Sequence, residues 1–125
     1  METVILFKCF IISILLHIID DFVLQTVCLS KLKQKSFWMK HEDYCEKYKN
    51  DYRMALLIHS ISWSIMIMLP LLFASSNILL IAVCLFFNTI IHYITDDYKA
   101  NKFKINLIQD QTIHLFQIIL TYLLF

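Results

Sequence analysis

Histidine and aspartate recur at helical spacing in this chain of 125 residues. Three pairs stand four positions apart: His17/Asp21, His92/Asp96 and Asp110/His114. Positions four apart lie on one face of a helix, so each pair would present an imidazole and a carboxylate together. Helical bundles hold metal ions between facing helices with ligands of these two kinds. The spacing therefore predicts one metal site shared by several helices.

Six residues are the predicted ligands: His17, Asp21, His59, His92, Asp96 and His114. A set of three or four nitrogen and oxygen ligands would suit zinc, and a carboxylate-rich set of six would suit manganese, iron or magnesium. The sequence does not choose among these divalent metals. Asp20 and Asp97 stand beside matched acids, which leaves open which neighbour has the role.

Four further residues are predicted to act on a substrate: Asp110, Gln111, Gln25 and Lys99. Asp110 would be a general base or would orient a histidine. Gln25 and Gln111 would position substrate or water, and Lys99 would bind a phosphate. A divalent metal lowers the pKa of a water molecule that it binds to about 7, which is the basis of hydrolase chemistry at neutral pH.

The elements that must position these residues are membrane-spanning helices. Apolar residues make up 59% of the chain, the mean hydropathy is +0.66, and there is no glycine and one proline. Four apolar stretches approach the ~20 residues that cross a bilayer. We expect helices at about 4–27, 54–73, 78–95 and 105–125 in one all-α transmembrane domain, residues 1–125, with no separate soluble catalytic domain.

The apolar stretches also indicate whether the first is cleaved, where two of them are connected, and the state of the cysteines. The first lacks the basic leader and small-residue cleavage pattern of a signal peptide, so we expect it to remain attached. Residues 74–77 form a short uncharged connection, and Pro70 precedes it near a helix end, where proline is tolerated. The four cysteines form no CxxC pair, which indicates reduced thiols.

Ten of the eleven basic residues fall in two connections, about 30–53 and 99–104, and Lys8 is the exception. Because basic loops stay in the cytoplasm, both loops should be cytoplasmic and both termini outside, with Lys8 snorkelling outward. The first loop, with Phe37, Trp38 and Tyr44, reads equally as an amphipathic segment on the headgroups or as a solvated linker. A net charge of +1 does not favour nucleic acid binding.

This orientation places the histidines, aspartates and glutamines of the four predicted helices in the cytoplasmic half of the bilayer. The outer halves are nearly all Ile, Leu, Phe and Met, so no polar path is expected there. Each ionisable group within a span costs at least ~2.5–3.5 kcal/mol on insertion scales, which favours one shared functional site. A purely structural hydrogen-bond network is the alternative interpretation.

The chain also resembles a family of small bacterial and phage membrane proteins catalogued as domain of unknown function 3307. The family pattern is H-x-x-x-D-F-x-x-Q in the first helix, a histidine in the second, H-x-x-x-D-x-x-K ending the third and D-Q-x-x-H in the fourth. Here these positions are His17, Asp21, Phe22, Gln25; His59; His92, Asp96, Lys99; and Asp110, Gln111, His114. The resemblance extends over residues 17–114 and implies a multi-pass protein of the bacterial cytoplasmic membrane, but no activity.

Three functions compete on these observations. The first is a metal-dependent hydrolase acting on a lipid or a small amphiphile. The second is a protein that binds or transports protons or divalent cations, which at this size would need to form a homo-oligomer. The third is a structural or signalling partner whose loop, about residues 30–53, docks a cytoplasmic protein or anionic lipid. Membrane lipids are expected partners in every case.

Overall fold

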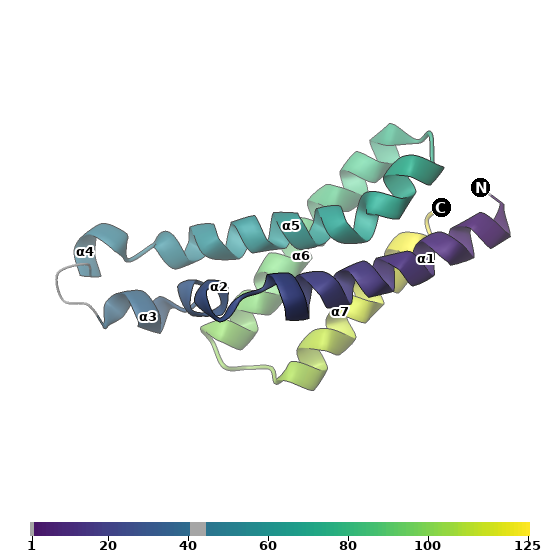
Figure 1. The fold of residues 1–125 in the computed structure, drawn as a ribbon. Coiled ribbons are helices and arrows are strands. Elements are labelled where there is room, and N and C mark those ends of the chain that lie inside the picture. Colours follow the sequence, from purple (N-terminus) through teal and green to yellow (C-terminus); the bar gives the residue numbers. More distant parts are fainter. Residues whose placement is uncertain (1, 41–44) are drawn as a thin grey trace.

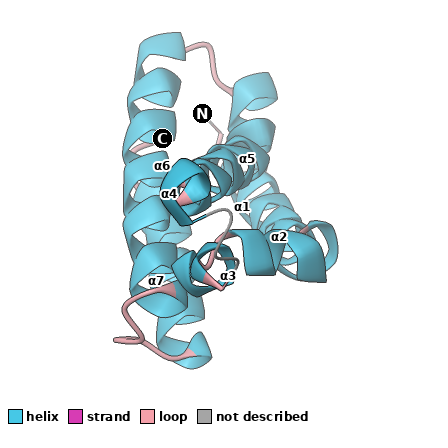
Figure 2. Ribbon diagram, turned by 90° about the vertical axis from the view of Figure 1, so that its left-hand side faces the viewer, coloured by secondary structure: helices cyan, strands magenta, loops and turns pink. Residues whose placement is uncertain are grey.

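The protein is helical in a computed structural model that describes residues 2–40 and 45–125, and these residues include no strand (Figure 1). The long helices are α1 (Thr3–Ile18), α5 (Asp51–Ala74), α6 (Ile78–Ala100) and α7 (Leu107–Tyr122). Helix α1 continues directly as a π-helix, η1 (Ile19–Leu24). Three short helices precede α5: α2 (Val27–Leu32), α3 (Lys35–Met39) and α4 (Cys45–Tyr48). Loops are short by comparison (Figure 2).

The long helices pack around a common interior. Helix α5 contacts both α1 and α6, and α7 contacts both α6 and α1. Both chain termini and the α5–α6 connection lie at one end, which we call the terminal end (Figure 1). Helices α2 to α4 and the α6–α7 connection lie at the opposite end, which we call the loop end (Figure 1).

Within the described residues, three helical segments are long and apolar enough to cross a membrane: Thr3–Leu24, Glu46–Ala74 and Ile78–Ala100. They match the first three predicted spans, although the first stops before residue 27 and the third extends well beyond residue 95. Pro70 lies within α5, about one turn before its end, so the carbonyl of Met66 has no helical N–H donor there, and the helix continues to Ala74.

Helix α7 is shorter than the predicted fourth span, 105–125. Its 16 residues extend about 24 Å at 1.5 Å per residue, against ~30 Å of hydrocarbon. The late start has a local cause: Asn106 and Gln109 form a reciprocal capping box that begins the helix at Leu107. Apolar residues 123–125 follow α7 without continuing it.

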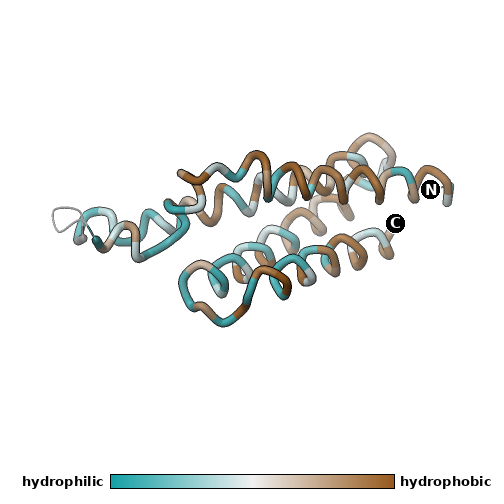
Figure 3. The backbone as a smooth tube through the Cα atoms, turned by 60° about the horizontal axis from the view of Figure 1, so that its bottom comes forward, coloured by the Kyte–Doolittle hydropathy of each residue, from teal (hydrophilic) through white to brown (hydrophobic). Residues whose placement is uncertain are grey.

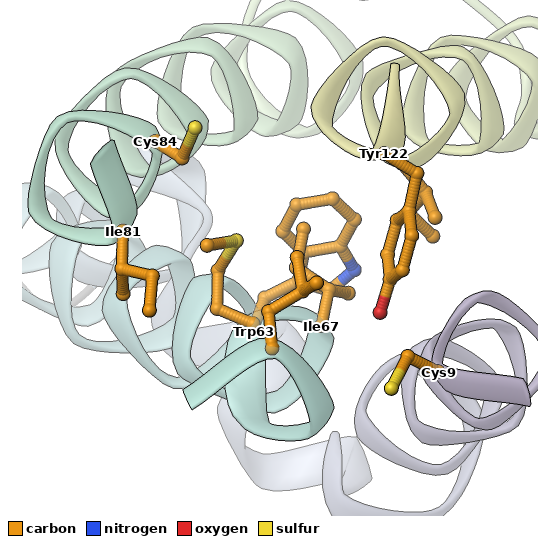
Figure 4. Packing of buried hydrophobic residues seen from close by; sticks show 9 residues of the cluster. Cys9, Trp63, Ile67, Ile81, Cys84 and Tyr122 are labelled. Atoms are coloured by element: carbon orange, nitrogen blue, oxygen red, sulfur yellow. The ribbon is translucent and has the colours of Figure 1, made fainter. Parts of the chain in front are cut away.

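The apolar core lies toward the terminal end, where Trp63, Ile67, Ile81 and Tyr122 are buried together (Figure 4). Hydrophobic residues dominate this half of the backbone, and hydrophilic ones gather at the loop end (Figure 3). All four long helices also expose large apolar side chains, such as Phe7, Phe73, Phe86 and Phe116. Exposed apolar surface on every helix is what a lipid-facing exterior requires.

The predicted loop of residues 30–53 is largely helical where it is described; residues 41–44, including Tyr44, lie outside the described residues. Trp38 Nε1 donates a hydrogen bond to the carbonyl oxygen of Leu32 at 2.9 Å, which closes α3 back onto α2. Lys33 is only 4% exposed and points into the helical interior. The buried position of Lys33 fits neither a solvated linker nor a segment confined to the lipid headgroups.

Candidate metal centre

Four buried histidines meet between the long helices, one from each: His17 on α1, His59 on α5, His92 on α6 and His114 on α7. The His92 ring stacks on His114 with 4.2 Å between centroids. Trp63 also stacks on His92, with 4.3 Å between centroids. The sequence expectation that these polar residues converge at one level of the helices agrees with this geometry.

Four carboxylates surround the histidines: Asp20 and Asp21 on η1, Asp96 on α6 and Asp110 on α7. Each is anchored through one oxygen by a donor from another element. Ser62 donates to Asp20 Oδ1 (2.8 Å), Gln111 to Asp21 Oδ2 (2.9 Å), Lys33 to Asp96 Oδ2 (2.6 Å) and Lys99 to Asp110 Oδ2 (2.6 Å). Hydrogen bonds of this kind orient ligating carboxylates in metalloproteins.

The π-helical turn explains how two consecutive acids both reach the interior. Gln25 N donates to Asp20 O, five residues back, at 2.9 Å, so this turn is wider than an α-helical one. Asp20 is 1% exposed, and the side chain of Asp21 is 6% exposed. Asp20 therefore belongs to the cluster, whereas the sequence left open whether Asp20 or Asp21 has the role.

The remaining atoms of the cluster face one another without direct hydrogen bonds. Among the described residues, the following buried atoms have no hydrogen-bond partner: Asp20 Oδ2, Asp21 Oδ1, Asp110 Oδ1, His59 Nε2, His114 Nε2 and both nitrogens of His92. His59 Nε2 lies 3.5 Å from Asp21 Oδ1, and His114 Nε2 lies 3.4 Å from Asp110 Oδ1. Buried polar atoms are normally paired, so a concentration of unpaired ones calls for a partner.

The spacing of these atoms suits a metal ion. Two ligands bound to one tetrahedral zinc at about 2.0–2.1 Å are themselves about 3.3–3.4 Å apart. Two groups of three residues have ligand atoms within 4.8 Å of one another: Asp21, His59 and His92; and His92, Asp96 and His114. The groups share His92, so five of the six predicted ligands lie in one continuous arrangement.

Charge also favours a divalent cation. Four carboxylates (Asp20, Asp21, Asp96, Asp110) and two ammonium groups (Lys33, Lys99) leave the cluster at −2 when the histidines are neutral. Buried charge in a low-dielectric interior is strongly unfavourable unless it is compensated. One divalent cation would bring this cluster to neutrality.

Other predicted residues lie next to this arrangement. His17 is outside both groups: its Nδ1 accepts a hydrogen bond from Trp63 Nε1 at 2.8 Å and lies 3.7 Å from Asp21. Gln111 donates to Asp21 and also to Asp110, at 3.1 Å, so its amide positions carboxylates. Gln25 lines a cavity beside Asp96.

Asp97 stands apart from the cluster. Its carboxylate pairs with Lys102 at 3.1 Å and accepts a hydrogen bond from Asn101 at 2.9 Å, on the loop-end surface. Of the two adjacent acids on α6, the structure thus turns only Asp96 toward the histidines.

Several residues of the candidate centre were not predicted from the sequence. Ser62 and Trp63 follow His59 by three and four residues, and Gln117 follows His114 by three, so helical spacing from a histidine was an available signal. Lys33 had no such signal, because it is one of several lysines in a basic segment.

The terminal half of the helices contains a chain of polar contacts, so the prediction that it has no polar path is wrong. His114 Nδ1 lies 3.3 Å from Gln117 Oε1, and Gln117 Nε2 donates to the backbone oxygen of Asn88 at 3.2 Å. Asn88 in turn donates to Thr121 Oγ1 at 2.8 Å. Individual polar residues separated by apolar ones on α6 and α7 align into a chain only after the two helices pack.

Comparisons with known protein families, curated proteins and solved structures find no match for this chain. Because fold alone does not identify function, a function can be inferred only from the residues of the candidate centre.

Proposed function

We propose that this protein is a multi-pass membrane metalloprotein that holds a divalent cation among Asp21, His59, His92, Asp96 and His114. The observation that carries the proposal is the set of unpartnered buried nitrogen and oxygen atoms that face one another at metal-ligand spacing. A structural network would have paired these atoms with each other, as it has paired Asn88 with Thr121. Zinc, manganese and iron are the candidate ions.

The proposed setting is the cytoplasmic membrane of a bacterium, with four helices across the bilayer, both termini outside and the loop end in the cytoplasm. The basic residues of the loop end support this orientation. Helix α7 belongs in the membrane because it packs on α1 and α6 and exposes Phe116, Ile119 and Leu120. On the motif residues of the sequence alone, we also propose membership of the family catalogued as domain of unknown function 3307.

The proposed activity is hydrolysis of a lipid or a small amphiphile that reaches the loop end. The bound metal would supply Lewis-acid activation of water. Asp110 Oδ1, which lies 3.4 Å from His114 Nε2, would hold that histidine or accept a proton from water. Gln111 would keep Asp21 and Asp110 in place, and Lys99, paired with Asp110 at 2.6 Å, would face the substrate.

The first experiment is elemental mass spectrometry of detergent-purified protein. We expect near-stoichiometric metal in the wild type and little in Asp96→Asn or His92→Ala. Asp97→Asn is the matched control, because it removes an adjacent carboxylate outside the centre. Thermal melting would verify that each variant is folded. A folded wild type that contains no metal, although metal was supplied during expression, would disprove the proposal.

Hydrolysis needs its own experiment. The metal-loaded protein would be reconstituted with bacterial lipid extract, and the products would be identified by mass spectrometry. Asp110→Asn should abolish product formation with the metal retained. Retained metal without any product from the wild type would leave the metal centre in place and remove the hydrolase activity.

A second candidate, movement of protons or divalent cations, is favoured by the chain His114–Gln117–Asn88–Thr121, which extends polar contacts into the terminal half. Proton relays in pumps and transporters use Asp, Glu and His side chains, and His114 is the member of this chain that belongs to that group. Proton or manganese flux into vesicles containing the protein, abolished by Asn88→Leu, would support this function. Flux equal to that of empty vesicles would reject it.

A further inference from the structure

A small cavity of about 200 Å³, lined by polar residues together with Ala100 and Phe103, lies at the loop end, directly beside the candidate metal centre. Its polar lining comes from separate segments of the chain: Gln25, Ser30, Lys33, Gln34, Asp96 and Lys99. Asp96 belongs to both the cavity and the centre, and Lys99 holds Asp110 of the centre at 2.6 Å. A molecule in the cavity would therefore lie next to the metal ligands.

The lining is rich in donors. Two lysines, two glutamines and one serine line the cavity, and Asp96 is the polar lining residue whose side chain only accepts. Within the described part of the chain, the side chains of Gln25, Ser30 and Gln34 make no hydrogen bond to other protein groups. Donors without protein partners beside two cations favour a ligand with several anionic oxygens.

The two lysines can serve such a ligand without breaking their ion pairs. Each ammonium group carries three donors, and Lys33 uses one on Asp96 while Lys99 uses one on Asp110. The side chain of Lys99 is 34% exposed, so it can be approached from the loop end. The remaining donors of both lysines are available to the cavity.

We propose that this cavity binds the phosphate group of the molecule on which the metal centre acts. This inference rests on the proposed function and names its substrate class, a phosphate-bearing compound. The charges of the centre link metal binding to phosphate binding: with neutral histidines the metal-free centre has a net charge of −2, which opposes a nearby anion, and a divalent cation removes that opposition. Phosphate should therefore bind to the metal-loaded protein and poorly to the metal-free protein.

The test uses isothermal titration calorimetry on the full chain in phosphatidylcholine nanodiscs, with metal content measured on each sample. One titrant is inorganic phosphate, and the other is short-chain phosphatidic acid, with short-chain phosphatidylcholine, a zwitterion of zero net charge, as the comparison. Binding of inorganic phosphate indicates a free phosphate compound as the ligand. Binding of phosphatidic acid alone indicates a lipid headgroup. Either result supports the inference.

Two variants locate the binding. Gln34→Leu and Gln25→Leu should each weaken binding about tenfold, because each removes a donor to a charged group. Both should keep normal metal content, since neither side chain is a ligand in the proposed centre. Lys35→Gln, which removes an exposed lysine of the same segment, is the control and should bind as the wild type does.

The outcomes separate the two proposals. Normal metal content without binding of either titrant overturns the phosphate site and leaves the metal centre standing. Binding that is unchanged in Gln34→Leu and Gln25→Leu also overturns it, because the ligand then lies elsewhere. A wild type without metal overturns the proposed function, and the phosphate site with it.

Discussion

His114 is oriented by a residue of its own helix. Gln117 Oε1 lies 3.3 Å from His114 Nδ1, and the Gln117 amide is fixed by Asn88. A proton on Nδ1 would then leave the lone pair of Nε2 directed at Asp96 and Asp110, at 3.7 and 3.4 Å. Such contacts determine which nitrogen of a ligating histidine faces the metal.

Gln117→Leu should therefore lower metal affinity about 10–100-fold, the usual effect of losing an outer partner of a ligand. Gln117→Glu should restore most of the affinity, since it keeps the acceptor. Competition with a metal chelator measures both. Thr112→Ala, an exposed change on the same helix, serves as the control. Equal losses in the Leu and Glu variants would argue against orientation as the cause.

Lys33 is a buried cation supplied by a basic segment. Its Nζ is 2.6 Å from Asp96 Oδ2, and both side chains are about one-twentieth exposed, at 5% and 6%. Lys33→Gln should destabilise the metal-free protein by about 3–5 kcal/mol, because it leaves a buried carboxylate without its cation.

Thermal unfolding in detergent tests this expectation with Lys35→Gln as the matched control. Adding Asp96→Asn to Lys33→Gln should recover part of the lost stability, since no unpaired charge then remains. A melting temperature of Lys33→Gln equal to that of the wild type would mean that the ion pair contributes nothing to the fold.

At the scale of elements, the π-helix η1 determines how Asp20 and Asp21 meet the rest of the centre. Deleting Val23, a residue 67% exposed within η1, would convert the wide turn into an α-helical one. The chain after the deletion would rotate relative to α1, which would displace Gln25 and Lys33. We expect the loss of most bound metal, with membrane insertion unchanged because the span remains long enough.

Metal content and carbonate-resistant membrane association measure the two effects separately. Val23→Leu, which keeps the chain length, is the control and should retain metal. A deletion variant with wild-type metal content would show that the wide turn is dispensable.

For the whole molecule, the proposed orientation predicts that Ser76 and Lys102 lie on opposite sides of the membrane. Both are exposed, Ser76 in the α5–α6 connection and Lys102 in the α6–α7 connection. In a variant without the native cysteines, Ser76→Cys should react with an impermeant maleimide on intact cells. Lys102→Cys should react only after the membrane is opened, because basic loops stay in the cytoplasm. The reverse pattern would invert the topology.

Much of the architecture follows from local sequence. Apolar runs of nearly bilayer length determine the three spanning segments, and the i, i+4 repeats on them bring histidines and acids to common faces. The start of the fourth helix was harder to predict, because it is set by the capping box of Asn106 and Gln109.

The sequence by itself determined the helical class, the three spans and most members of the centre, because hydrophobic length and helical period are local properties. Only the tertiary structure decided that Lys33 enters the interior, that Trp63 lies among the histidines, and that Asp96 faces the centre while Asp97 does not. These outcomes depend on how helices rotate and approach one another. Helix packing places residues far apart in the chain within a few ångströms, and no local pattern encodes that placement.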